Sequence, residues 1–193
     1  MAFDENALNL LLARMTTQHT VRGFVFNAMV EHVAEKKGDV IASGLQERIL
    51  KKRPSDLLSY PASDFFKLLH GGAVALEDPA GQDEAVRALG FASAAGFFAS
   101  PMGRLLLTIV GRGNPARLMA NEPTAYATSF SFGKRKFKRV GEQSIQLTHA
   151  EDFLPVPYNL GALQGAMAAV GATAQQVLAT HLVPDGATYE ITW

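Results

Sequence analysis

Residue types capable of catalysis are present, but their spacing matches no catalytic motif. The chain has no cysteine, which excludes disulfides, thiol nucleophiles and cysteine metal sites. Ser129, Ser131 and Ser144 stand outside any Gly-x-Ser-x-Gly sequence. The neighbouring Glu151 and Asp152 could act as an acid/base pair, although adjacent carboxylates before a proline-rich segment are usually exposed. We therefore expect no catalytic residue and no enzyme activity. A hydrolase or transferase is a third alternative, which a cluster of His149 or His181 with carboxylates would favour.

Two further patterns are weak signals for a metal or a phosphate. Glu31, His32 and Glu35 would share one face of a helix, because positions three and four apart are neighbours there. One histidine with two glutamates also describes an ordinary solvated face, so no metal is expected. Gly111-x-Gly113 lacks the preceding strand and the Gly-Lys-Ser/Thr of a phosphate loop. We interpret it as the end of a helix.

One segment is strongly basic, with five cations in six residues around one phenylalanine: Lys134, Arg135, Lys136, Phe137, Lys138 and Arg139. Such a run could contact a phosphate, a nucleotide, an anionic lipid head or a partner's acidic surface. The alternative is a hairpin tip whose charges keep it soluble and prevent edge pairing. Because 18 basic residues balance 18 acidic ones, no overall field attracts polyanions, and nucleic acid is not an expected partner.

Aromatic residues mark a possible apolar pocket. Phe91, Phe97 and Phe98 alternate with small residues in a helical pattern from 83 to 110, which Pro101 should bend or split. Together with Tyr126 and Phe130 they could line a pocket for a small apolar ligand, since such pockets are mainly hydrophobic. The alternative is that these rings simply fill the core.

The C-terminal stretch must position these groups. Leu160, Leu163 and Met167 recur at helical spacing from 158 to 170, and Gly171 is a plausible helix end. Residues 177–183 and 187–193 read as two strands around the turn signal Pro184-Asp185-Gly186. Gly161 and Gly165, four residues apart, would let another backbone approach, either within the chain or from a partner.

The residue pattern of the N-terminal third predicts three helices: one capped by Asp4 or Asn6, one over 21–37, and one from Asp39. A fourth should run from an N-cap at Ser63 to Leu76. Residues 126–132 and 137–147 alternate like strands. The predicted fold class is α+β, with a helical N-terminal part packed on a three- to four-stranded antiparallel C-terminal sheet. We expect a single domain over 1–193, mainly helical over 1–122, with sheet and one helix (158–170) over 123–193.

Chain length and hydropathy limit where in the cell the protein is expected. A chain of 193 residues with 48% apolar content suits one core. No apolar stretch reaches the ~18 residues of a membrane span. The start, MAFDENALNLLLARM, lacks the basic region of a signal peptide. The expectation is a cytoplasmic protein.

A series of structural glycines and prolines, ending in a tryptophan, extends over 21–193. It comprises Tyr60-Pro61, Ala88-Leu89-Gly90, Gly103-Arg104, Gly111, Pro115, Leu154-Pro155, Gly161, Gly165, Gly171 and Tyr189-Glu190-Ile191-Thr192-Trp193. This spacing resembles a large paralogous family of uncharacterised proteins found in myxobacteria. The resemblance implies organism class and fold, and it implies no activity.

A second resemblance is carried by Arg22-Gly23-Phe24-Val25-Phe26, by Glu35-Lys36-Lys37-Gly38-Asp39-Val40 and by the closing helix and hairpin. These are similar to haem nitric-oxide-binding sensor domains and to the related four-vinyl-reductase and vesicle-tethering domains. The resemblance implies helices on a C-terminal antiparallel sheet, with haem, small aromatic molecules or an acyl chain held between them.

The chain departs from the haem-binding members of that group at two places. Residues 117–124, which should supply their proximal histidine, contain none. Tyr126-Ala127-Thr128-Ser129-Phe130 differs from their Tyr-x-Ser-x-Arg clamp for the haem propionates. No cofactor is therefore expected. The predicted function is a non-enzymatic sensory or regulatory domain that binds a small apolar ligand between helices and sheet. The alternative is a homodimeric protein-interaction or scaffold module without ligand. The expected partners are a second copy of the chain or a signalling protein.

Overall fold

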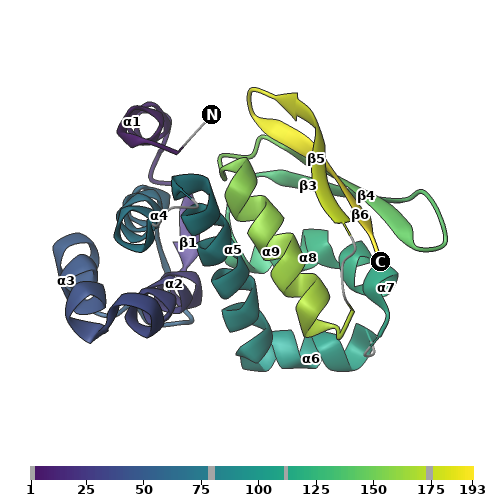
Figure 1. Cartoon of the computed structure of the whole chain (residues 1–193), viewed down its shortest axis with the longest axis horizontal. Helices are drawn as coiled ribbons and strands as arrows, with labels where there is room; N and C mark the ends of the chain where they lie inside the picture. Colours follow the sequence, from purple (N-terminus) through teal and green to yellow (C-terminus); the bar gives the residue numbers. More distant parts are fainter. Residues whose placement is uncertain (1–2, 78–80, 111–112, 173–175) are drawn as a thin grey trace.

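The computed structural model describes residues 3–77, 81–110, 113–172 and 176–193. A group of helices lies on one side and a sheet with its own helices on the other (Figure 1). The first part comprises α1 (Glu5–Leu12), β1 (Thr20–Arg22), α2 (Gly23–Lys37), α3 (Asp39–Leu50), β2 (Ser59–Pro61), α4 (Ala62–Leu76) and α5 (Gln82–Ala99). The second comprises α6 (Pro101–Val110), α7 (Pro115–Ala120), α8 (Glu122–Ser129), β3 (Lys134–Arg139), β4 (Ser144–Ala150), α9 (Val156–Ala169), β5 (Gln176–Val183) and β6 (Gly186–Thr192).

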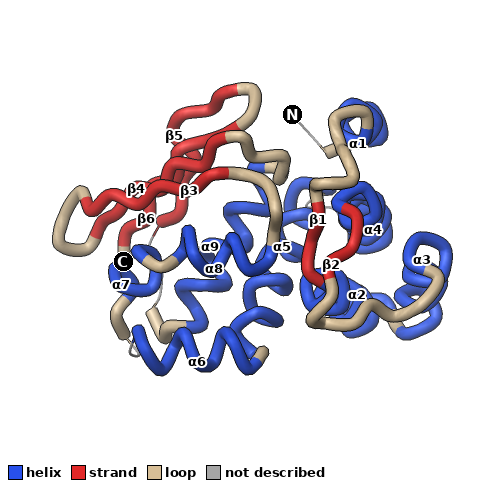
Figure 2. The backbone as a smooth tube through the Cα atoms, turned by 180° about the vertical axis from the view of Figure 1, so that it is seen from behind, coloured by secondary structure: helices blue, strands red, loops and turns tan. Residues whose placement is uncertain are grey.

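The C-terminal sheet of the described residues has four antiparallel strands in the order β3-β4-β6-β5. Figure 2 shows it from behind, above α8 and α9. The predicted α+β class and the antiparallel sheet are confirmed. Alternation along β4 directs Ile145, Leu147 and His149 inward, since successive side chains of a strand point to opposite faces. A histidine thus occupies a position of the core face.

Helices α5 and α9 lie side by side at the junction of the two parts (Figure 1). Their backbones approach through glycines: a Cβ on Gly161 would lie 1.8 Å from the carbonyl oxygen of Arg87, and one on Gly90 would lie 2.1 Å from that of Tyr158. Gly165 packs against Phe91 in the same way. The predicted close approach occurs within the chain. The expectation that the Gly161/Gly165 face could serve a partner is therefore wrong.

Several local predictions hold because they rest on short-range chemistry. The backbone N–H of Ala7 donates to the Asp4 carboxylate (2.8 Å), which caps α1 as expected. The long helical pattern splits at Pro101, between α5 and α6. Gly171 follows α9 with φ +79°, a left-handed conformation that suits a glycine at a helix end. The predicted turn of Pro184-Asp185-Gly186 joins β5 to β6.

Other local predictions are wrong. Residues 126–132 were expected in a strand, but Tyr126 lies in α8, which has Pro123 in its first turn. The basic run forms β3, an edge strand of the sheet, and is not a hairpin tip. Helix α4 begins at Ala62 after Pro61, so Ser63 is not its N-cap. The short β1-β2 pair was not anticipated. The predicted helix end at Gly111-x-Gly113 includes residues 111 and 112, which lie outside the described residues.

None of the described helices is both long and apolar enough to cross a membrane.

Candidate functional site

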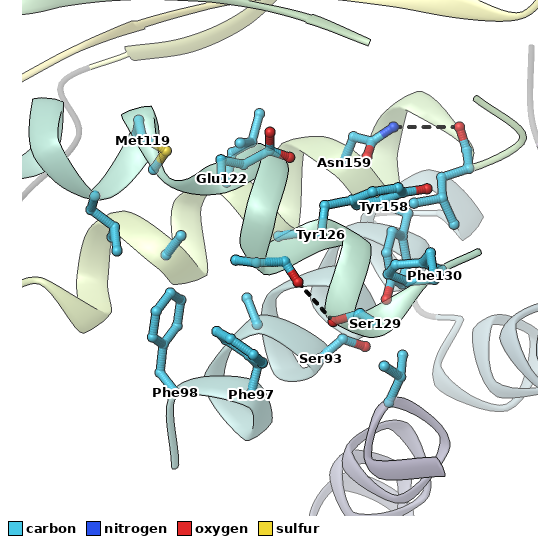
Figure 3. A pocket seen from close by; sticks show the side chains of 18 of the residues that line it. Ser93, Phe97, Phe98, Met119, Glu122, Tyr126, Ser129, Phe130, Tyr158 and Asn159 are labelled. Atoms are coloured by element: carbon cyan, nitrogen blue, oxygen red, sulfur yellow. Dashed lines mark hydrogen bonds between the residues drawn. The ribbon is translucent and has the colours of Figure 1, made fainter. Parts of the chain in front are cut away.

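A cavity of about 110 Å³ lies where the helical part meets the sheet. Helices α5, α8 and α9 form most of its wall, α2 contributes Phe24 and Val25, and β4 contributes His149 (Figure 3). Its apolar side is aromatic: Phe97 and Phe98 of α5 meet edge to face, with ring centres 5.0 Å apart. Tyr126 and Phe130 stack at 4.8 Å on another side.

The structure places four of the five predicted pocket residues at this cavity. Phe97, Phe98, Tyr126 and Phe130 line it. Phe91 is not part of the lining, and 41% of it is exposed to solvent, so the prediction that it lines the pocket is wrong. Whether these residues bind a ligand stays a prediction.

The polar lining was not foreseen from the sequence. Glu122 of α8, His149 of β4 and Asn159 of α9 border the cavity, together with Ser93 and Tyr158. The Ser93 hydroxyl donates to the Leu89 carbonyl (2.8 Å), so it is satisfied within its own helix. The cavity therefore combines aromatic walls with one polar region around Glu122 and His149.

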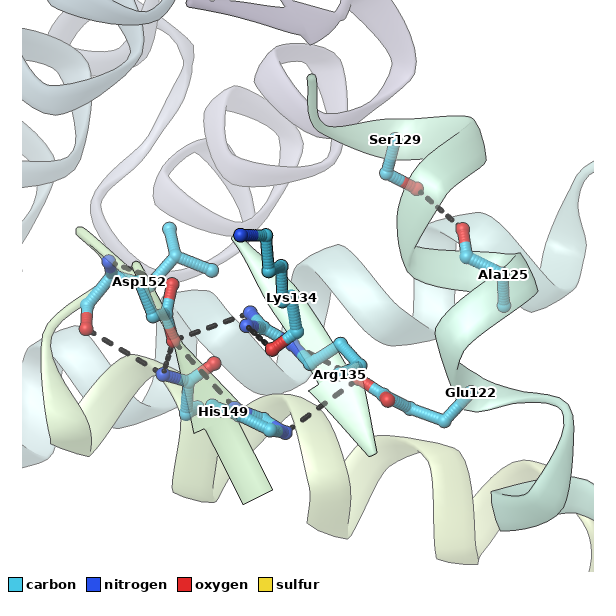
Figure 4. A network of polar contacts seen from close by, with 9 residues as sticks. Glu122, Ala125, Ser129, Lys134, Arg135, His149 and Asp152 are labelled. Atoms are coloured by element: carbon cyan, nitrogen blue, oxygen red, sulfur yellow. Dashed lines mark hydrogen bonds and ion pairs between the residues drawn. The ribbon is translucent and has the colours of Figure 1, made fainter. Parts of the chain in front are cut away.

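That region belongs to a buried ion cluster (Figure 4). Arg135 lies at its centre, with Nη2 3.2 Å from Asp152 Oδ2 and Nε 3.3 Å from Glu122 Oε1. His149 lies between the same carboxylates, with Nδ1 3.6 Å from Asp152 Oδ2 and Nε2 3.7 Å from Glu122 Oε1. The side chains of Arg135, His149 and Asp152 are at most 2% exposed, whereas that of Glu122 is 16% exposed. Charges this deep in a core need close partners.

Neighbouring groups fix the cluster in place. Asp152 accepts hydrogen bonds from the Asn159 amide (2.8 Å) and from the backbone N–H of Leu154 (3.1 Å). The guanidinium of Arg135 stacks over the Tyr126 ring at 3.6 Å, a cation–π contact. Asp152 is thereby the best satisfied anion of the cluster.

Burial shifts the protonation of these groups in opposite directions. Burial raises the pKa of Glu122 to about 7, a rise that the Arg135 charge opposes. Burial lowers the pKa of His149 to about 4, against the attraction of Asp152. Burial also disfavours ionised Asp152, but the charge of Arg135, the adjoining His149 and the hydrogen bond from Leu154 outweigh it and hold the pKa of Asp152 below its ordinary value. At neutral pH, His149 is neutral, Asp152 is ionised and Glu122 is near its midpoint.

Some atoms of the cluster remain unsatisfied. Within the described residues, Glu122 Oε2, the Tyr126 hydroxyl and both ring nitrogens of His149 are buried without a hydrogen-bond partner. Arg135 Nε and Nη2 also lack a hydrogen bond of good geometry, although both keep their ion-pair contacts with Glu122 and Asp152. Buried polar atoms in folded proteins are nearly always paired, so each such atom calls for an explanation. Within the same residues, no group of three or more His, Asp and Glu side chains could hold a metal ion.

The basic run does not form a uniform patch. Arg135 belongs to the cluster, Lys134 pairs with Glu151, and Arg139 donates to the carbonyls of Gly141 (3.0 Å) and Glu142 (2.9 Å). Lys136 and Lys138 are exposed on the edge strand. Contact of this run with an anion or a partner stays a prediction, and on this geometry it would depend mainly on Lys136 and Lys138.

One sequence signal could have located Arg135. In a strand, alternation places Arg135 on the face opposite Lys134 and Lys136. Arg135 also pairs in register with His149 across β3 and β4, so both face the core. Glu122 offers no comparable signal, because its helix was predicted as loop and strand.

The comparisons with known proteins agree with this architecture. The family described as "Protein of unknown function (DUF2378)" matches residues 14–193. The chain belongs to this family. No protein with a curated description matches it. A myxobacterial origin stays a prediction.

Solved structures of H-NOX proteins share the fold. One from Shewanella oneidensis is 16% identical, with a TM-score of 0.74 over 89% of this chain and 95% of that chain. Another from K. algicida is 14% identical, with a TM-score of 0.65 over 89% and 95%. This chain thus shares the H-NOX fold. At this identity the likeness concerns the fold alone.

The residues at the cavity do not fit haem. Haem iron is held by His, Cys, Met or Tyr side chains. Its histidine candidate here, His149, is flanked by Glu122 and Asp152 at the polar edge. The cavity of about 110 Å³ is also far below the ~300 Å³ at which drug-sized ligand pockets begin, and Phe97 and Phe98 occupy its wall.

Proposed function

We propose that this protein is a sensory or regulatory domain that binds a small apolar ligand in the cavity between α5, α8, α9 and the sheet. The observation that carries this proposal is an aromatic-walled cavity at the junction of the two parts of the fold. A ligand there would touch Phe24 of α2, Phe97 of α5 and Leu163 of α9 together. Binding can therefore favour one packing of these elements over another, as a sensor requires.

The volume sets the size of the ligand. An engineered cavity of about 150 Å³ lined by apolar side chains stays dry and binds benzene or xenon. A cavity of about 110 Å³ suits a molecule of roughly four or five heavy atoms by the same comparison. Rings that filled the core completely would leave no such volume, which favours the ligand interpretation over simple core packing.

The fold supports a sensory role without supplying the ligand. The related H-NOX structures include Fe(II)NO and Fe(II)CO ligation states. In this chain, Met119 and His149 border the cavity of about 110 Å³. We infer that this chain uses the cavity for a ligand that binds without haem.

A pair of helix variants tests the proposal. Ala162→Leu would fill the cavity from α9, whereas Ala168→Leu adds the same atoms on the exposed side of that helix. We expect benzene to raise the melting temperature of the wild type and of Ala168→Leu, and to leave that of Ala162→Leu unchanged. Equal responses of all three proteins would reject the cavity as the binding site. Native mass spectrometry of the purified protein would reveal a ligand retained from the cell.

A second candidate function, a homodimeric scaffold, is favoured by the other edge of the sheet. Strand β5 contains no Asp, Glu, Lys or Arg, and Leu182 and Val183 are 64% and 46% exposed. Natural edge strands are usually protected by charge, as β3 is here. Pairing of β5 with a second copy would cover this edge. Sedimentation should then show a dimer in the wild type and a monomer in Leu182→Lys; a monomeric wild type would reject this candidate.

A further inference from the structure

The polar edge of the cavity contains two hydrogen-bond acceptors that face each other. His149 is neutral at pH 7, because burial lowers its pKa to about 4, and it therefore carries one N–H. Ionised Asp152 lies 3.6 Å from Nδ1 and is the stronger acceptor, which places the hydrogen on Nδ1. Nε2 then presents a lone pair to Glu122 Oε1, 3.7 Å away. Two acceptors at this distance require a donor between them.

Glu122 has a second acceptor with the same need. Its Oε2 is buried without a partner among the described residues, while Oε1 already faces Arg135 Nε. A proton on Glu122 satisfies one of these acceptors. A ligand with several N–H groups could satisfy both Glu122 Oε2 and His149 Nε2.

The charges around Glu122 distinguish between ligand classes. Arg135 of β3 is the one cation of the cluster, and it faces two carboxylates, Glu122 of α8 and Asp152 after β4. The other polar groups packed around them are uncharged at neutral pH: His149 of β4, Tyr126 of α8, Tyr158 and Asn159 of α9, and Tyr189 of β6. The ionised cluster thus has one negative charge in excess. An anionic ligand would add repulsion, whereas a cation would restore neutrality.

Building on the proposed ligand-binding function, we propose that the cavity takes a small primary amine, with its ammonium at Glu122 and His149 Nε2 and its apolar body against Phe97 and Phe98. An ammonium group has three donors and no acceptor, so it can donate to both Glu122 Oε2 and His149 Nε2, which are buried without partners among the described residues. A hydrocarbon part of about four carbons corresponds to the size of the cavity (about 110 Å³). Neutral and anionic molecules of the same shape lack this match.

The amine should compete with a proton for Glu122. A primary alkylamine stays charged up to a pKa of about 10.4, as lysine does, so only the site titrates between pH 6 and 8. Because Glu122 titrates near pH 7, about a tenth of it is ionised at pH 6 and about nine-tenths at pH 8. The ammonium prefers the ionised form. Its affinity should therefore rise roughly tenfold from pH 6 to pH 8.

The test compares three four-carbon probes with one shape: isobutylamine, isobutanol and isobutyrate. Each is titrated into 15N-labelled wild type, Glu122→Gln and the exposed control Glu142→Gln at pH 6 and pH 8. We expect isobutylamine to bind the wild type and the control with the tenfold pH dependence. Glu122→Gln should bind it at least tenfold more weakly at pH 8 and without pH dependence. Isobutanol should bind all three proteins equally, and isobutyrate should not bind.

Two results would overturn the assignment of an amine. One is equal affinity of isobutylamine and isobutanol for the wild type, and the other is unchanged amine binding in Glu122→Gln. Either result leaves the proposed ligand-binding function intact, because a neutral probe still occupies the cavity. If neither benzene nor any four-carbon probe binds, the ligand-binding function itself fails. The two failures are thus distinguishable.

Discussion

Glu122 and His149 should give the folded protein two opposite dependences of stability on pH. The pKa of Glu122 rises from an ordinary 4.5 to about 7 on folding. The stability it contributes is complete below pH 4.5 and is lost as the pH rises through 7. The pKa of His149 falls from 6.5 to about 4. Its contribution is complete above pH 6.5 and is lost as the pH falls through 4. In the wild type the two nearly cancel between pH 4.5 and 6.5.

Single substitutions separate these effects. Each pKa difference corresponds to about 3 kcal/mol, because one pKa unit is worth about 1.4 kcal/mol. Relative to wild type, Glu122→Gln should gain about 3 kcal/mol of unfolding free energy as the pH rises from 4.5 to 7. His149→Gln should instead lose about 3 kcal/mol relative to wild type between pH 4 and 6.5. Contributions of the remaining acids cancel in these differences.

Urea unfolding at half-unit steps from pH 4 to pH 8 measures both differences. Glu142→Gln, an exposed carboxylate in the β3-β4 turn, is the control and should follow the wild type within about 0.5 kcal/mol. If the unfolding free energies of Glu122→Gln and His149→Gln, each relative to wild type, changed in the same direction with rising pH, the opposite pKa shifts of the two residues would be refuted. If neither variant's difference in unfolding free energy from wild type changed with pH, Glu122 and His149 would not be buried as the structure places them.

Three further predictions concern packing. Arg135→Met leaves two buried carboxylates without their cation and should lower the unfolding free energy in urea by about 3 to 5 kcal/mol, whereas the exposed Lys138→Met should change it by less than about 0.5. Gly161→Ala forces a Cβ to 1.8 Å from a carbonyl of α5 and should cost at least about 2 kcal/mol in thermal melts. Gly44→Ala, with nothing within 4 Å among the described residues, should gain up to about 1 kcal/mol. Phe97→Ala should cost about 3 to 5 kcal/mol and strengthen benzene binding, because it enlarges the cavity. A Phe97→Ala protein that binds benzene more weakly would contradict the cavity assignment.

The fold was predictable where local chemistry decides it. Pro101 cannot continue α5 without losing a hydrogen bond, and Gly171 adopts a conformation that other residues resist, so both boundaries are visible in the sequence. The failure at 126–132 has a tertiary cause. Tyr126 stacks on Phe130 and supports Arg135, and these contacts favour a helix over the strand that the alternation suggested.

The site was only partly predictable, because its parts come from different elements. The aromatic wall near Phe97 could be read from one helix. The ion cluster joins β3, β4, α8 and the segment before α9. Strand alternation separates Lys134 and Lys136 from Arg135, but alternation alone does not tell whether the buried side chain is that of Arg135. Its burial follows from pairing with His149, which only the register of the sheet reveals.

The position of the ion cluster bears on why the protein contains it. Replacing a buried ion pair with well-packed apolar residues is often neutral or stabilising, so packing of the core does not require Arg135 and its partners. The adjoining inward residues Ile145, Leu147 and Ile191 are apolar and fully buried. The cluster instead borders the cavity, and its Glu122 Oε2 and His149 Nε2 are buried without a hydrogen-bond partner among the described residues. Acceptors held in fixed positions beside an apolar space are what recognition of a ligand with donors requires, because the protein need not reorganise when it binds.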